Sequence, residues 1–214
     1  MNAVTLPAVQ ALPADWPRRL RAVLAREPAP AHSAQVTGLM PEGDVSPAAV
    51  LVPIVQRPGG PVLLLTLRAG HLRQHAGQIS FPGGRIEPGD AGALAAALRE
   101  THEEIGIEPG FIEPLGYLPG QLVLTGFSIT PLVALVLPGY ALAIDATEVA
   151  GVIELPLGVV AQEQSFRTVP REVRGVRLQL QELPWDGHVI WGATAAMLRN
   201  LGMALRQATG EAAT

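Results

Sequence analysis

The sequence predicts an α/β (α+β) fold, in which helices cover both faces of a mixed central sheet. Short apolar runs typical of strands lie on both sides of a strong helical pattern at 91–105, and a second helical pattern closes the chain at 189–207. Hydrophobic residues make up 48% of the chain and the mean hydropathy is +0.28, which argues against disorder. A chain of 214 residues fits one domain with terminal additions.

The first 46 residues are rich in alanine and proline, and they are expected to form an N-terminal helix and arm. The helix is predicted at 14–26, and a loop or arm at 27–44. Three roles stay open for this segment: an arm, a lid or a dimer contact. Residues 47–214 are expected to form the main domain.

The main domain begins with two strands that the turn Pro58-Gly59-Gly60 joins into a hairpin. A second turn is predicted at Pro82-Gly83-Gly84. Asp90 is the expected N-cap of the helix at 91–105, which should end near Gly106. The expected strands cover 49–56, 62–67, 78–81, 115–124, 127–137, 152–155 and 177–183.

The residue types exclude several kinds of chemistry. There is no cysteine, so disulfides and thiolate metal sites are absent, and there is no lysine, so all 15 basic residues are arginines. The net charge of −4 gives no general attraction for nucleic acid. Neither a signal peptide nor a membrane-spanning segment is visible, so we expect a cytoplasmic protein without a membrane partner.

The helical pattern at 91–105 carries a stripe of acidic side chains. At about 100° per residue, Glu100, Glu103 and Glu104 share one arc beside the apolar face. Like charges at this spacing repel one another, and a hard divalent cation such as Mg²⁺ or Mn²⁺ removes the conflict. The alternative is a solvated acidic face. The glycine pair at Gly83-Gly84 favours a site, because glycines let the backbone approach a ligand closely.

These residues resemble the Nudix hydrolase box, Gly-x5-Glu-x7-Arg-Glu-U-x-Glu-Glu-x-Gly-U, where U is a bulky aliphatic residue. The chain departs from this box at Asp90, which replaces the first glutamate, at Thr101, and in an eight-residue spacer before Arg99. The segment before the box, LLTLRAGHLRQHAGQISFPGG at 64–84, is similar to the signature of the coenzyme A diphosphatase branch, which shares these departures. Softer similarity extends to the segment from Ile190 to Thr194. The residues that match the box are Gly84, Arg99, Glu100, Glu103, Glu104, Gly106 and Ile107.

The resemblance implies a Nudix-like α/β/α sandwich and hydrolysis of coenzyme A to 4′-phosphopantetheine and adenosine 3′,5′-bisphosphate. Glu100 and Glu104 are then the expected ligands of Mg²⁺ or Mn²⁺, and the carbonyl group of Gly84 can also reach a metal. Glu103 is expected to add a ligand, or to orient or deprotonate the attacking water. Arg99 is expected to position Glu103 through an i,i+4 ion pair. The candidates for phosphate contacts are Arg68, Arg73 and Arg85.

Several alternatives stay open. Arg68 or Arg73 could pair with a carboxylate to hold the loop, and His71 and His75 are expected to have structural or solvent roles. Glu148 is a candidate loop base, although capping a short helix is the favoured role for it. The substrate could be another nucleoside diphosphate derivative such as ADP-ribose. A binding protein without catalysis and a homodimer are further open alternatives.

Overall fold

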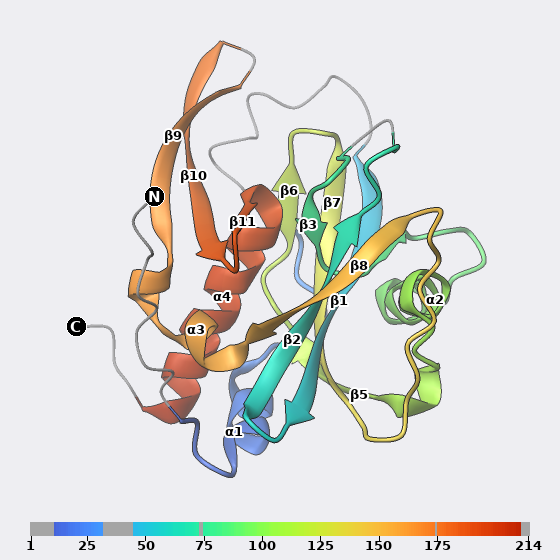
Figure 1. Ribbon diagram of the computed structural model, residues 1–214, viewed down its shortest axis with the longest axis vertical. Coiled ribbons are helices and arrows are strands. Elements are labelled where there is room, and N and C mark those ends of the chain that lie inside the picture. The colour runs from blue at the N-terminus through green and yellow to red at the C-terminus, as the bar shows by residue number, and fades with distance from the viewer. Residues whose placement is uncertain (1–10, 32–44, 73–74, 174, 211–214) are drawn as a thin grey trace.

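The computed structural model describes residues 11–31, 45–72, 75–173 and 175–210. Its main sheet has the strand order β3-β2-β1-β7-β5, with β4 paired to β1, β6 to β7 and β8 to β2 (Figure 1). The pair β1–β7 is parallel and the other pairs are antiparallel, so the sheet is mixed as predicted. Its strands are β1 (Ser46–Arg57), β2 (Gly60–Arg68), β3 (Ile79–Ser80), β4 (Gly83–Arg85), β5 (Ile112–Tyr117), β6 (Gln121–Val123), β7 (Phe127–Val136) and β8 (Val149–Pro156).

A smaller antiparallel sheet has the order β11-β10-β9 and lies beside the last helix. Its strands are β9 (Arg167–Val173), β10 (Val176–Trp185) and β11 (His188–Trp191). The helices are α1 (Trp16–Val23), α2 (Ala93–Ile105), α3 (Leu157–Ala161) and α4 (Gly192–Thr209), with 3₁₀ turns η2 (Pro109–Phe111) and η3 (Glu163–Ser165). None of the helices in the described ranges is long and apolar enough to cross a membrane.

Helices cover both faces of the main sheet, which confirms the predicted sandwich (Figure 1). Strand β1 is buried on both sides, because its alternate residues enter two different cores. Val52 and Ile54 join the core that contains residues of α1 and α4, whereas Leu51 and Val55 join the core that contains residues of α2. The long apolar run at 49–56 is explained by this double burial.

The predicted N-terminal helix is present as α1, and it is part of the fold. Trp16 and Leu20 are buried in the same core as α4. The greater part of the expected arm, at 32–44, lies outside the described residues. The division of the chain between residues 46 and 47 stays a prediction.

The turn predicted at Pro82-Gly83-Gly84 was wrong. Gly83-Gly84 does not form a turn but belongs to β4, where Gly83 pairs with Val50 and Gly84 with Ala49. A Cβ atom on Gly83 would lie 2.4 Å from the carbonyl oxygen of Ala49, so only glycine permits this approach. Such long-range pairing leaves no local signal in the sequence.

The closing helix begins later than predicted. Residues 188–191 form β11, which alternates exposed Val189, buried Ile190 and exposed Trp191. Gly192 has a φ of 65° and ends this strand before α4. The run predicted as one strand at 115–124 is divided into β5 and β6. Strand β9 was not predicted, because its polar and proline-containing sequence lacks an apolar alternation.

Candidate active site

Arg99 is the centre of an ion-pair network beside the acidic residues of α2. Its guanidinium donates to both carboxylate oxygens of Asp90 at 3.0 Å, to Glu100 Oε1 at 3.0 Å and to Glu103 Oε2 at 2.9 Å. It also donates to the carbonyl oxygen of Arg85 at 3.1 Å. The hydrogen bonds that Arg99 donates to Asp90 and Glu100 raise the pKa of Arg99, and Arg99 in turn lowers the pKa of Asp90. The network holds the loop between β4 and α2 against the middle of α2.

Asp90 therefore has a different role from the predicted N-cap. Helix α2 begins at Ala93 with Gly92 as its N-cap residue, and no side chain caps it. Asp90 instead accepts the amide hydrogen of Glu87 and pairs with Arg99, nine residues later. Its charge serves the ion-pair network and not the first turn of the helix.

Glu104 is the buried carboxylate of the site, with only 4% of its surface exposed. The amide of Gly83 donates to its Oε2 at 3.3 Å, and Arg68 Nη1 lies 3.9 Å from its Oε1. Burial raises the pKa of Glu104 from 4.5 to about 8, and the charges of Glu100 and Glu148 contribute to the rise. Without a cation, this carboxyl is largely protonated at neutral pH.

Glu100 is packed against the paired glycines. A Cβ atom on Gly84 would lie 2.4 Å from Glu100 Oε1, so the missing side chain gives the carboxylate its space. Burial is also the main cause that raises the pKa of Glu100, and the hydrogen bond from Arg99 opposes it. Glu103 is different, because its side chain is 56% exposed and is directed to Arg99. Two of the three glutamates therefore meet the glycine strand, and the third extends into solvent.

A fourth carboxylate, Glu148, comes from the loop before β8. The amide of Asp145 donates to the carbonyl oxygen of Glu104 at 3.0 Å, and the amide of Ala69 donates to that of Glu148 at 2.8 Å. A ring nitrogen of His71, Nε2, lies 3.0 Å from the carbonyl oxygen of Thr147. Residues 146–148 form a turn, so Glu148 does not cap a helix. The sequence suggested this residue only as an alternative, because nothing local links it to α2.

The three predicted phosphate ligands have different surroundings. Arg68 lies beside Glu104, and its Nε is buried without a hydrogen-bond partner. The guanidinium of Arg85 lies over the ring of Phe127, with 5.1 Å between its carbon and the ring centroid. Arg73 lies outside the described residues. Of this set, only Arg68 is in ion-pair distance of a candidate metal ligand in the described structure.

No group of three or more histidine, aspartate or glutamate side chains within the described ranges is arranged to hold a metal ion. Arg99 binds Glu103 and one oxygen of Glu100, so these two carboxylates are already paired within the chain. The predicted ligand set stays a prediction. Its chemistry nevertheless fits a hard divalent cation, because the buried Glu104 and the partly buried Glu100 are oxygen donors that repel each other.

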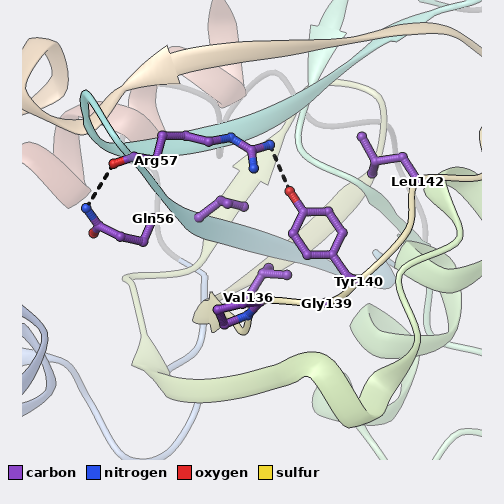
Figure 2. Close-up of a pocket in the computed structure, with 8 residues that line it drawn as sticks. Gln56, Arg57, Val136, Gly139, Tyr140 and Leu142 are labelled. Atoms are coloured by element: carbon purple, nitrogen blue, oxygen red, sulfur yellow. Dashed lines mark hydrogen bonds between the residues drawn. The ribbon is translucent and has the colours of Figure 1, made fainter.

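Two cavities of the described structure lie elsewhere. One of about 420 Å³ opens at the last residues of β1, where Arg57 donates to the Tyr140 hydroxyl at 2.9 Å (Figure 2). Another, of about 620 Å³, adjoins Arg57 and includes Trp16 and Glu154. Neither is lined by a glutamate of α2. We therefore locate the candidate site by its chemistry and not by the size of a cavity.

A family model described as "NUDIX domain" matches residues 45–188, which include β1, the whole of α2 and the loop that carries Glu148. The chain belongs to the Nudix family. It is 42% identical over 156 residues to the "Uncharacterized Nudix hydrolase NudL" of Salmonella paratyphi B, and equally to that of Salmonella newport; the match covers 73% of this chain and 81% of each relative. A solved Nudix hydrolase of M. smegmatis, RenU, is 22% identical and covers 57% of this chain and 80% of that chain, with a TM-score of 0.47.

Membership of the Nudix family defines the general class of reaction. As a Nudix hydrolase, the chain acts on a diphosphate bond of a small nucleoside diphosphate derivative, and Nudix hydrolases generally use divalent metal ions. The residues that match the Nudix box include Glu100 and Glu104 of α2 and Gly84 of β4. The site and the family thus support the same class of reaction.

Proposed function

We propose that this Nudix hydrolase cleaves the diphosphate bond of coenzyme A and releases 4′-phosphopantetheine and adenosine 3′,5′-bisphosphate. The observation that carries the proposal is the position of the segment 64–84, which resembles the coenzyme A diphosphatase signature. Arg68 of this segment lies 3.9 Å from Glu104, and Gly83 donates its amide to the same carboxylate. The substrate-specific part of the sequence thus borders the residues proposed to carry out the chemistry.

We assign Glu100 and Glu104 as the principal ligands of Mg²⁺ or Mn²⁺, with Glu103 and the carbonyl oxygen of Gly84 as further ligands. Both principal carboxylates are oxygen donors whose burial disfavours their charge, and a divalent cation would offset this cost. When bound, the ion stabilises the charge that develops on the phosphoryl oxygens and makes water a better nucleophile near neutral pH.

Carboxylates of the chain carry out the proton transfer. The oxygen of water forms a new bond to phosphorus, the bridging phosphorus–oxygen bond breaks, and Glu103 orients the water or accepts its proton. Arg99 holds Glu103 at 2.9 Å and so acts as a positioning residue. Glu148 is the alternative base, because its charge already influences both Glu100 and Glu104.

Arginines supply the phosphate contacts. Arg68 has a free, buried Nε next to the carboxylates, which suits a phosphate oxygen that arrives with the metal. Arg85 directly follows Gly84, and its guanidinium lies over the ring of Phe127, which is a favourable cation–π position. Arg73 belongs to the same signature and completes the proposed set.

Product analysis tests the proposal. Coenzyme A and ADP-ribose are incubated separately with the protein, with and without Mg²⁺ or Mn²⁺, and the products are separated by chromatography. We expect metal-dependent release of 4′-phosphopantetheine from coenzyme A. Turnover of ADP-ribose alone would refute the substrate and favour the alternative within the family. Undiminished turnover by Glu104→Gln would refute the metal assignment.

A further inference from the structure

The small sheet carries an exposed aromatic residue beside two exposed arginines. In the strand register, Glu182 of β10 lies opposite Arg167 of β9 and opposite Trp191 of β11. Residues that pair directly across antiparallel strands project from the same face. Arg171, four residues after Arg167, projects from this face as well. The four side chains therefore share one surface, which has no assigned role.

Glu182 fixes the positions of both arginines. It is 2% exposed and receives Arg167 Nη2 at 3.0 Å on one oxygen and Arg171 Nη2 at 2.5 Å on the other. The side chains of Arg167 and Arg171 remain 56% and 52% exposed. One buried negative charge thus holds two guanidiniums side by side, and the group keeps a net positive charge toward solvent. Such a pair suits the several oxygens of a phosphate.

Trp191 leaves 41% of its surface exposed, although an indole is among the most favourable side chains to bury. An exposed indole offers an aromatic face on which a nucleobase can stack. The ring shares its face with the two arginines, with β10 between them, so this face offers the two kinds of contact that a nucleotide needs.

The surface is linked to the candidate active site through β3. Thr194, in the first turn of α4, donates from its hydroxyl to the carbonyl oxygen of Ile79 at 3.1 Å. Ile79 begins β3, and the chain leaves this strand after Ser80 and reaches Gly83, the first residue of β4, which donates its amide to Glu104. Strand β3 also contacts β11 and pairs with Thr66 and Leu67 of β2, directly before Arg68. Figure 1 shows β3 between β11 and the start of β8, which follows Glu148.

We infer that Trp191, Arg167 and Arg171 bind the nucleoside end of the substrate, where the indole stacks on the base and the guanidiniums contact a phosphate carried by the ribose. The inference rests on the proposed function, since coenzyme A carries a 3′-phosphate in addition to its diphosphate. It adds a specificity that the carboxylates cannot supply, because dephospho-coenzyme A has the same diphosphate and lacks that phosphate.

Steady-state kinetics with coenzyme A and with dephospho-coenzyme A test the arginines. Arg171→Gln should raise KM for coenzyme A about tenfold, the usual effect of losing one charge-assisted hydrogen bond, and leave KM for dephospho-coenzyme A and both kcat values nearly unchanged. Arg171→Lys keeps the charge and should restore part of the difference. The comparison of two substrates on one variant is insensitive to the fraction of folded enzyme. The matched control is Arg177→Gln, an arginine of the same hairpin on the opposite face.

Trp191→Ala should raise KM for both substrates, and Trp191→Phe should recover most of the loss. Equal effects of Arg171→Gln on the two substrates would overturn the inference and leave the proposed function intact. If the protein does not hydrolyse coenzyme A, calorimetry with adenosine 3′,5′-bisphosphate and with adenosine 5′-monophosphate decides the question. Weaker binding of only the bisphosphate by Arg171→Gln would support the surface although the proposed function had failed, and unchanged binding of both would refute it.

Discussion

Replacing Glu104 with glutamine is expected to stabilise the metal-free protein at neutral pH while it abolishes metal-dependent turnover. The pKa of Glu104 is about 8 in the folded state, against 4.5 for an ordinary glutamate. Between these values the folded state binds more protons than the unfolded state, so the free energy of unfolding falls as pH rises. Glutamine resembles the protonated carboxyl and removes this dependence.

The size of the stability difference follows from the interval between the ordinary pKa of 4.5 and the raised pKa of about 8. Each pH unit between 4.5 and 8 costs the wild-type protein about 1.4 kcal/mol, so at pH 7 Glu104→Gln should be more stable by at most about 3.5 kcal/mol. For a chain of this size, that difference corresponds to at most roughly 7–14 °C in Tm. Below pH 4.5 the two proteins should melt together. The groups that influence Glu104 are Arg68, which attracts the charge, and Glu100 and Glu148, which repel it.

The assay is thermal unfolding in EDTA from pH 5 to pH 9, followed by circular dichroism. The matched control is Glu103→Gln on the same helix, whose carboxylate is exposed and should give a pH profile parallel to that of the wild type. Added Mg²⁺ or Mn²⁺ should stabilise the wild type more strongly as pH rises toward 8, and should not stabilise Glu104→Gln. Parallel pH profiles for the wild type and Glu104→Gln would refute the argument that burial disfavours the charged form of this carboxyl.

Three further predictions address the geometry. Gly84→Ala places a methyl group 2.4 Å from Glu100 Oε1, so it should displace that carboxylate and lower kcat about a hundredfold with little change in Tm; an unchanged kcat would remove Glu100 from the site. Arg99→Lys loses the planar fork that joins Asp90 to Glu100 and Glu103, and it should lower kcat at least tenfold; wild-type kinetics would show that the network does not position Glu103. Gly202→Ala puts its Cβ 2.3 Å from the carbonyl oxygen of Val160, and this clash should outweigh the better helix propensity of alanine. The free energy of unfolding, measured by urea titration, should fall by about 1–3 kcal/mol. A gain in stability would contradict the close packing of α3 on α4.

The parts of the structure that local physics dictates were predictable from the sequence. Helix α2 follows from apolar periodicity, which also places Glu100 and Glu104 near one another. The hairpin of β1 and β2 follows from Pro58-Gly59 between two apolar runs, and the structure pairs Arg57 with Gly60 around this turn. In both cases the signal lies within a few residues of the element that it specifies.

The remaining features depend on contacts between distant segments. The pairing of Gly84 with Ala49 joins residues 35 apart in the chain, and it converts an expected turn into a strand. Glu148 reaches the site only because its loop bonds to the backbone of Glu104 and Ala69. The surface of Trp191 and the arginines depends on the register of three strands, one of which has a polar sequence without an apolar alternation. Periodicity cannot reveal such long-range pairings.

The arrangement of charge explains how the acidic residues coexist before a cation binds. Arg99 neutralises Glu100 and Glu103 from one side, and Arg68 approaches Glu104 from the other, but at 3.9 Å it is too distant for a direct hydrogen bond. A carboxyl with a pKa of about 8 is largely protonated at neutral pH, which removes its repulsion with Glu100 and Glu148. If Glu100 and Glu104 hold the metal as proposed, the ion would take the place of this proton and would compete with Arg99 for Glu100. A diphosphate bound with the ion would then offer its own oxygens to Arg68 and Arg99.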